Sequence, residues 1–257
     1  MSVTFAELHA MLRARPQRPG APVKSPAFLA PDENRLWTHL MTWRNNKAVA
    51  HPRQVFYAAS YGTEQANLTR NAVAQMARGE HPATHLGALA NSDVRVYEMD
   101  LDTSHAALSE NEAAHAISYG LLAVEEGTDL LLLGTLSAGA ANAVAALNEK
   151  MMHAKVADVF ALFAASGGVD LCAALGAAMA ARMANVPVIV DQDLAGLLHA
   201  ALCLLCDGAD ESPVAAAWEG ALRFDAAVQP LMSWHHLKGL IALMPARPAL
   251  TTLSHAA

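Results

Sequence analysis

Glycines and a serine follow a buried apolar run near the middle of the chain. Leu130 to Leu133 are four consecutive leucines, and the next six residues are Gly134-Thr135-Leu136-Ser137-Ala138-Gly139. An alanine-rich stretch with helical character begins at Ala140. This order predicts a strand, a turn and a helix, so free N–H groups of the turn and the helix dipole could hold an anion such as phosphate. The alternative is that the glycines serve only to make the turn tight.

A second group of small residues, Ser166-Gly167-Gly168, precedes another predicted helix. It allows the same two interpretations, a phosphate site or a tight turn. Asp191 follows a short apolar strand predicted at 186–190. The carboxyl end of a parallel strand opens on the usual ligand-binding crevice, so this carboxylate could bind a ligand hydroxyl group. It could equally cap the helix that follows.

Other reactive patterns in the sequence carry less information. The glycine turn lacks the Lys-Ser/Thr end of a Walker A loop, and no Gly-x-Ser-x-Gly elbow offers a hydrolase nucleophile. Cys203 and Cys206 lie in an apolar helical stretch, so we expect buried thiols rather than a redox or metal pair. His235 and His236 are adjacent and point in different directions on a helix, which argues against a metal site. We therefore expect no metal and no cofactor.

Composition excludes several classes of protein. The 257 residues carry a formal net charge of −7 and no basic stripe, which argues against nucleic-acid binding. The chain is 54% hydrophobic, largely through alanine, but no uninterrupted apolar segment of about 18 residues predicts a membrane span. Three cysteines without a regular framework fit a reducing cytoplasm, and the N-terminus lacks the apolar core of a signal peptide.

Strands and helices alternate along most of the chain. This alternation predicts an α/β fold with three layers, in which a mostly parallel, Rossmann-like sheet carries helices on both faces. The predicted strands are 54–59, 94–99, 130–133, 156–163 and 186–190. The predicted helices are 2–14, 33–46, 68–78, 82–90, 109–126, 140–152, 169–184, 193–206, 212–224 and 233–243.

Prolines set the N-terminal part of the chain apart. Residues 15–32 contain Pro16, Pro19, Pro22, Pro26 and Pro31, a density that excludes a regular helix and favours an extended surface segment. We therefore divide the chain into an N-terminal arm, residues 1–32, and a single α/β domain, residues 33–257.

Read in order, these segments resemble the nicotinate-nucleotide–dimethylbenzimidazole phosphoribosyltransferase family over roughly residues 24–240. Strand 54–59 with Ser60-Tyr61-Gly62 is similar to the family's first strand, which usually ends in Ala-Asp-His-Gly. The turn 134–139 falls where the family has Gly-Glu-Met-Gly-Ile-Gly-Asn-Thr-Thr. Residues 166–177 are similar to its Gly-Gly-Phe-Glu-Ile-Ala-Ala-Leu-Ala-Gly segment, and 186–191 to a strand that ends in Leu-Asp-Gly. The order and spacing are more specific than any one segment.

The resemblance implies a reaction and a site. Family members transfer phosphoribose from nicotinate mononucleotide to dimethylbenzimidazole or a related aromatic base, in the synthesis of the lower ligand of cobamides. A homodimer is also implied. The residues implied to contact phosphate and ribose are Gly134, Ser137, Gly139, Asn142, Gly167, Gly168 and Asp191, and those implied to line the base pocket are Ser60, Tyr61 and Gly62.

The departures from the family fall on the chemistry. Ser60-Tyr61 stands in place of Asp-His, and the turn 134–139 lacks the family's glutamate, central glycine and Asn-Thr-Thr group, unless Asn142 substitutes two residues later. The family's Arg-Leu-Gly-Glu-Gly segment carries the glutamate thought to act as base on the benzimidazole nitrogen. Here that region reads His235-His236-Leu237-Lys238-Gly239-Leu240, and no carboxylate occurs after Asp225.

The base has no obvious replacement in this sequence. Glu219, His235 or His236 could serve only if the C-terminal region folds differently. Three hypotheses therefore stay open. The chain could be an active but divergent phosphoribosyltransferase. It could be a non-catalytic paralogue or partner subunit that binds a nucleotide or a cobamide precursor. It could also be an unrelated α/β enzyme that shares the fold alone.

Overall fold

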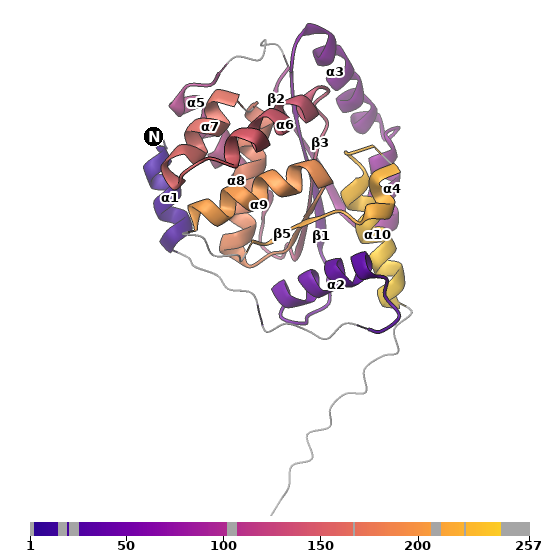
Figure 1. Cartoon of the computed structure of the whole chain (residues 1–257). Coiled ribbons are helices and arrows are strands. Elements are labelled where there is room, and N and C mark those ends of the chain that lie inside the picture. Colours follow the sequence, from indigo (N-terminus) through magenta and orange to yellow (C-terminus); the bar gives the residue numbers. More distant parts are fainter. Residues whose placement is uncertain are drawn as a thin grey trace, which may run out of the picture.

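A parallel sheet of five strands forms the centre of the computed structural model (Figure 1). The structure describes residues 3–14, 20, 26–101, 107–166, 168–206, 212–223 and 225–242. The strand order is β2-β1-β3-β4-β5, and every neighbouring pair is parallel. Helices cover both faces, so the predicted three-layer α/β fold is confirmed. The strands are β1 (Pro52–Ala59), β2 (Asp93–Asp100), β3 (Leu130–Thr135), β4 (Val188–Val190) and β5 (Val214–Ala216).

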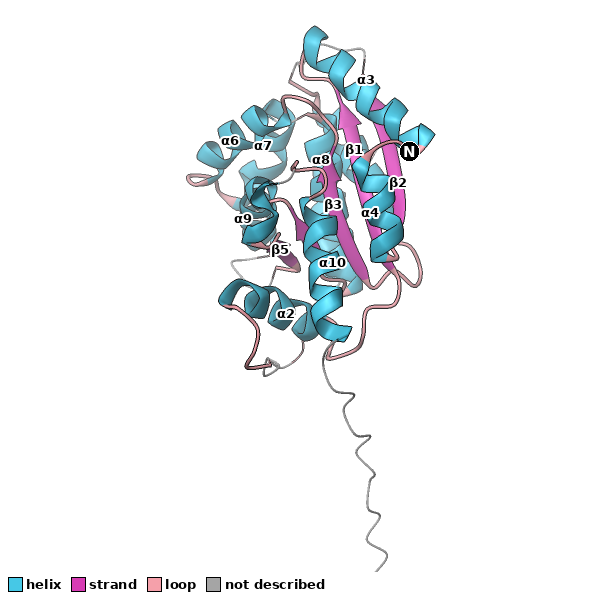
Figure 2. Ribbon diagram, turned by 90° about the vertical axis from the view of Figure 1, so that its right-hand side faces the viewer, coloured by secondary structure: helices cyan, strands magenta, loops and turns pink. Residues whose placement is uncertain are grey.

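Each face of the sheet has its own hydrophobic core beneath its own layer of helices (Figure 2). One layer holds α1 (Phe5–Ala14), α5 (Glu110–Gly120), α6 (Ala140–Met151), α7 (Val159–Ser166), α8 (Val169–Ala184) and α9 (Gln192–Leu205). The other holds α2 (Pro31–Trp43), α3 (Thr63–Arg78), α4 (Pro82–Ala90) and α10 (Gln229–Ala242). No helix in the described part of the chain is long and apolar enough to cross a bilayer.

The continuous apolar character of the central strands follows from this burial on both sides. In β1, Val55 and Tyr57 face the core under α8, whereas Phe56 and Ala58 face the core under α10. Successive side chains of a strand point to opposite faces, so a strand covered on both faces is typically a nearly continuous apolar run. The four leucines of β3 follow the same rule.

The strand order creates a point where the chain reverses direction across the sheet. From β1 the chain runs through α3 and α4 on one face to β2, and from β2 through α5 on the other face to β3. The carboxyl ends of β1 and β3 therefore lie next to each other while their following segments diverge. This arrangement is the topological switch point at which open α/β sheets bind ligands.

Two short segments differ from the sequence prediction. Residues 156–163, predicted as a strand, form a 3-10 turn (Val156–Asp158) and the start of α7, because a short apolar run looks alike in a buried strand and a buried helix. Residues 212–224, predicted as a helix, instead contain β5 and a 3-10 turn, Glu219–Arg223. The predicted helix at 233–243 exists but begins earlier, at Gln229.

The segment predicted as an N-terminal arm contains helical structure at both ends. Leu8 and Leu12 of α1 are buried in the core beside α5 and α7, and Phe5 stacks on Phe160 with ring centroids 5.2 Å apart. Pro31 begins α2, two residues before the predicted start, at a position where its missing N–H costs nothing. Residues 15–19 and 21–25, with three of the arm's prolines, lie outside the described residues.

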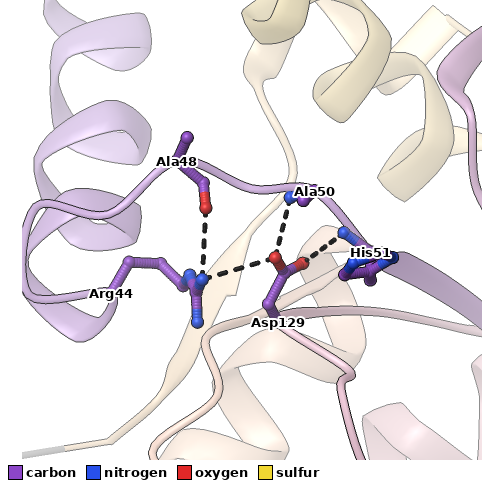
Figure 3. A network of polar contacts seen from close by, with 5 residues as sticks. All are labelled: Arg44, Ala48, Ala50, His51 and Asp129. Atoms are coloured by element: carbon purple, nitrogen blue, oxygen red, sulfur yellow. Dashed lines mark hydrogen bonds and ion pairs between the residues drawn. The ribbon is translucent and has the colours of Figure 1, made fainter.

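A buried carboxylate joins two loops at the amino-terminal edge of the sheet (Figure 3). Asp129, just before β3, accepts hydrogen bonds from the N–H groups of Ala50 (2.7 Å) and His51 (2.9 Å), just before β1. It also pairs with Arg44 at 3.3 Å, and the same guanidinium nitrogen donates to the carbonyl of Ala48. This network fixes the start of the two central strands.

Candidate functional site

The loops that follow β1 and β3 are joined to each other at the switch point. The N–H of Ala59 donates to Oγ of Ser137 at 2.8 Å, and the N–H of Leu136 donates to the carbonyl of Tyr57 at 3.0 Å. Ser137, predicted from the sequence as a ligand contact, is buried and holds the end of β1. These bonds bring the segment 60–62 against the glycine turn, as the parallel sheet required.

A third element, the start of α8, supplies a carboxylate to the same place. Asp170 is 1% exposed. Its Oδ1 accepts a hydrogen bond from the hydroxyl of Tyr61 at 2.6 Å, and its Oδ2 accepts one from the hydroxyl of Thr135 at 3.1 Å. Side chains from the β1 loop, the end of β3 and the start of α8 therefore meet around one carboxylate.

The sequence prediction had assigned no role to Asp170. A signal was present, because Asp170 is the only charged residue between Lys155–Asp158 and Arg182, in an otherwise apolar or small-residue segment. A lone carboxylate in such a segment is buried only when polar partners compensate it. The partners themselves come from residues distant in sequence and could not be read from it.

The N–H groups of the glycine turn already have acceptors within the protein. The N–H of Ser137 donates to Oγ1 of Thr135 (3.1 Å), and that of Ala138 to Oγ1 of Thr69 on α3 (3.0 Å). The N–H of Ala140 donates to the carbonyl of Ser137. With the bond from Leu136, four donors of the predicted anion cradle are engaged, so a phosphate here would have to replace hydroxyl or carbonyl oxygens.

Gly139 and Gly168 both pack against Tyr61. Gly139 has φ +89° at the N-cap of α6, and a Cβ there would lie 3.1 Å from Cβ of Tyr61. A Cβ on Gly168, the N-cap of α8, would lie 2.5 Å from the Tyr61 hydroxyl. The absence of a side chain at each position leaves room for the tyrosine.

The remaining glycines of the predicted site differ in position. Gly134 lies inside β3 rather than in the turn, paired with Phe56, and a Cβ on it would lie 2.9 Å from the Phe56 ring. Gly62 caps α3 with φ +124°. Gly167 lies outside the described residues. The ligand contacts predicted for these residues stay predictions.

Burial sets the protonation of the site's weak acids. Burial, together with the charge of Asp170, raises the pKa of the Tyr61 hydroxyl, so this group stays protonated and donates to the carboxylate. Burial also raises the pKa of the Cys172 thiol, two residues further along α8. Cys172 is therefore not a thiolate nucleophile at neutral pH.

Asp191 lies at the carboxyl end of β4, one strand beyond β3. Its Oδ1 accepts a hydrogen bond from the N–H of Leu194 at 3.0 Å, so it caps α9, which is one of its two predicted roles. The side chain is 6% exposed, and burial raises the pKa of its carboxyl group. A contact with a ligand hydroxyl stays a prediction.

The candidate bases lie on other elements than Asp170. Glu219 is exposed on the 3-10 turn after β5, and two strand spacings, roughly 10 Å, separate β5 from β3, whose Thr135 contacts Asp170. His236 on α10 pairs with Glu33 at 2.7 Å and stacks on Trp218 with ring centroids 4.2 Å apart. Asn142 is exposed on the first turn of α6.

Two further predictions concern cysteines and metals. Cys203 and Cys206, expected to be buried, are only partly buried, because they lie in the last turn and at the C-cap of α9. Sγ of Cys203 lies 3.6 Å from Nε2 of His199. Within the described residues, no group of three or more His, Cys, Asp or Glu side chains could hold a metal ion.

Comparisons with known proteins agree with this architecture. No family model matches the chain. Nicotinate-nucleotide–dimethylbenzimidazole phosphoribosyltransferase of Rhizobium leguminosarum bv. trifolii is 25% identical over 232 residues, covering 72% of this chain and 68% of the relative. The protein of the same name in Sinorhizobium medicae is 26% identical over 229 residues, with 71% and 68% coverage.

Solved structures share the fold. The Thermus thermophilus enzyme of the same name superposes with a TM-score of 0.64 at 17% identity, covering 91% of this chain and 94% of the other. CobT from the same organism superposes with a TM-score of 0.63 at 16% identity, with the same coverage. The chain is thus an open α/β protein with a polar cluster at its switch point. Its sequence is similar, at 25–26% identity, to nicotinate-nucleotide–dimethylbenzimidazole phosphoribosyltransferases, and its fold resembles that of solved proteins of that name.

Proposed function

We propose that the chain binds nicotinate mononucleotide at the crevice between β1 and β3 and transfers its phosphoribosyl group to an aromatic base. The observation that carries this proposal is that the β1 loop, the glycine turn and the start of α8 converge on one polar cluster. The relatives of the chain are named nicotinate-nucleotide–dimethylbenzimidazole phosphoribosyltransferases. Such convergence at a switch point is typical of nucleotide sites.

The reaction assigns a distinct task to each part of the crevice. A nitrogen of the incoming base bonds to C1 of the ribose, the bond from C1 to the nicotinate nitrogen breaks, and nicotinate leaves. Positioning of the ribose accounts for much of such a rate enhancement, and the N-termini of α6 and α8 are the groups suited to hold the phosphate. An acceptor must also take the N–H proton of the base, and Glu219 is the candidate.

Release of nicotinate tests the proposal directly. Purified protein is incubated with nicotinate mononucleotide and a panel of benzimidazoles, other azoles and phenols, and products are separated by chromatography. We expect nicotinate and a new base ribotide in equal amounts, with no release when either substrate is omitted. Intact nicotinate mononucleotide with every member of the panel would contradict transferase activity.

A non-catalytic role in nucleotide binding is the second candidate. It is favoured by the engaged N–H groups of the glycine turn and by the exposed position of Glu219, on another element than Asp170. Calorimetry with nicotinate mononucleotide distinguishes this candidate, which predicts heat of binding without turnover. Absence of heat at millimolar ligand would leave a role in protein interaction only.

We also propose that the protein works as a cytoplasmic homodimer, as the family resemblance and the cysteine usage suggest. Light scattering during size-exclusion chromatography should give twice the 27.1 kDa of one chain. A mass of one chain at micromolar concentration would contradict the dimer. Cell fractionation with an antibody should recover the protein with cytoplasmic markers.

A further inference from the structure

The Tyr61 side chain lies between Gly139 and Gly168, the glycines that precede α6 and α8. It packs against Gly139 at the start of α6 and against Gly168 at the start of α8. These helix starts are the groups suited to hold the phosphate of a nucleotide. A sugar phosphate bound between them would therefore overlap the tyrosine, and one of the two must move.

The partners of Asp170 indicate what chemistry the space accepts. Both oxygens of this buried carboxylate accept hydrogen bonds from hydroxyl groups, Tyr61 at 2.6 Å and Thr135 at 3.1 Å. An ionised carboxylate is an acceptor only and must be compensated by donors when it is buried. Neighbouring hydroxyls of a sugar are donors of the same kind as the tyrosine hydroxyl.

We propose that Asp170 binds a ribose hydroxyl of a sugar phosphate and that Tyr61 takes the place of this hydroxyl when no ligand is bound. Ligand entry then exchanges one hydroxyl donor for another on Oδ1, while Thr135 keeps its bond to Oδ2. No covalent step is involved. The inference rests on the proposed binding of a phosphoribosyl compound at this crevice, and it adds the residue that recognises the sugar and the residue that closes the site.

Displacement of Tyr61 weakens the apparent affinity for the ligand. A protein whose binding-competent state is only partly populated binds with its intrinsic dissociation constant divided by that population. Removal of the tyrosine ring should therefore tighten binding by about tenfold or more, because the open state no longer competes with the closed one. Removal of the hydroxyl alone should tighten binding by a smaller factor.

Calorimetry with ribose 5-phosphate and 2-deoxyribose 5-phosphate tests both parts. We expect Tyr61→Ala to bind ribose 5-phosphate at least about tenfold more tightly than the unaltered protein, with Tyr61→Phe in between. We expect Tyr61→Ala to prefer the ribose over the deoxyribose compound and Tyr61→Ala/Asp170→Asn to lose that preference. Tyr119→Phe is the matched control, since Tyr119 is 38% exposed and lies on α5, and it should leave both affinities unchanged.

Clear results would overturn the inference. If Tyr61→Ala and Tyr61→Phe, shown by circular dichroism to be folded, bind ribose 5-phosphate no more tightly than the unaltered protein or do not bind it, Tyr61 does not close the site. If the preference for ribose survives Asp170→Asn, Asp170 does not recognise the sugar hydroxyl. Because neither measurement involves an aromatic base, tighter binding by Tyr61→Ala without nicotinate release would reject the transferase while leaving this inference standing.

Discussion

Two carboxylates at the carboxyl edge of the sheet are compensated in different ways. Asp170 receives hydroxyl groups from β3 and from the β1 loop, so it joins three elements. Asp191 receives a backbone N–H of its own helix and so caps α9. Both are almost fully buried, but only the first links segments that a ligand could separate.

The pH dependence of stability should reveal the buried charge of Asp191. Burial raises the pKa of its carboxyl group above the ordinary 3.8, so the folded state binds the proton more readily than the unfolded chain. The contribution of Asp191 to the free energy of unfolding therefore falls as pH rises from 3.8 through the folded-state pKa. Asp191→Asn keeps a capping oxygen without the charge, and we expect it to abolish this fall.

Urea unfolding between about pH 4 and pH 7 measures this effect. At neutral pH Asp191→Asn should be at least as stable as the unaltered protein, whereas Asp191→Ala should lose about 1 kcal/mol because the cap is gone. A clear loss of stability in Asp191→Asn at neutral pH would show instead that the charge of Asp191 stabilises the fold.

Gly168 should not tolerate a side chain, because the Tyr61 hydroxyl group lies against it. A Cβ at Gly168 would lie 2.5 Å from the Tyr61 hydroxyl and 2.6 Å from Oδ1 of Asp170. We expect Gly168→Ala to lower the free energy of unfolding by about 1–3 kcal/mol. In a double-mutant cycle with Tyr61→Ala the loss should shrink by more than about 0.5 kcal/mol, since one clashing group is gone. Additive losses would indicate that Gly168 does not contact the tyrosine.

Sequence reasoning pointed to the loops that meet at the candidate site but not to Asp170, the carboxylate on which they converge. Tyr61, Ser137 and Gly168 were singled out because strand ends and glycine turns have local signals. The sequence indicates no role for Asp170 or Thr69, because their hydrogen bonds join residues that are far apart in sequence. Tyr61 and Asp170, for example, are 109 positions apart. Periodicity and spacing carry no information about such contacts.

At the level of elements, α5 and α8 approach closely enough that their glycines meet backbone. A Cβ on Gly176 of α8 would collide with the carbonyl of Ile117, and a Cβ on Gly120 of α5 with the carbonyl of Ala173. Alanines and glycines on both helices permit this approach. Asp170 lies in the first turn of α8, so the close packing of α8 against α5 also helps to position this carboxylate.

Gly176→Ala should therefore be strongly destabilising, although alanine favours a helix. Overpacking against backbone has no flexible side chain to yield, and we expect a loss of about 3 kcal/mol in the free energy of unfolding. Gly196→Ala on α9 is the matched control, since its Cβ would meet no atom within 4 Å, and it should gain about 0.5–1 kcal/mol. Thermal or urea unfolding compares them. Equal effects of the two substitutions would contradict the packing argument.

The long elements and the short strand β4 were predicted well, whereas β5 was not. Residue patterns predict the type of secondary structure clearly for α8, which is sixteen residues long, and for β1, which is eight residues long. The three residues of β5 were read as part of a helix, because Val214-Ala215-Ala216-Ala217 shows neither period within so short a span. Its strand character comes from pairing with β4, a tertiary contact.

Across the whole molecule, the buried Asp129 network and the proposed ligand site lie at opposite edges of the sheet. Asp129 and its donors lie at the amino-terminal edge (Figure 3), whereas the cluster around Asp170 lies at the carboxyl edge. The buried central strands β1 and β3 lie between them. A change at the amino edge should therefore alter folding stability and leave the site's affinity for ligands unchanged.

Asp129→Ala tests this separation. It leaves two backbone N–H groups and Arg44 without their acceptor, and we expect a loss of about 3 kcal/mol in the free energy of unfolding. Arg78→Ala, which breaks an exposed pair with Glu80, should cost less than about 1 kcal/mol. Well below the unfolding temperature, calorimetry should show unchanged affinity for ribose 5-phosphate in both. Weakened binding in Asp129→Ala would mean that the two edges are coupled.

The central position of β1 also bears on how the chain assembles during synthesis. All eight residues of β1 are buried in the finished fold, yet β1 precedes both of its neighbours in the chain. Because β2 is made before β3, the edge of β1 that will pair with β3 stays open until residue 135 has left the ribosome. An apolar strand with an open edge associates readily with other chains. The strand order that creates the switch point thus exposes the nascent chain to aggregation through β1 until its third strand has been made.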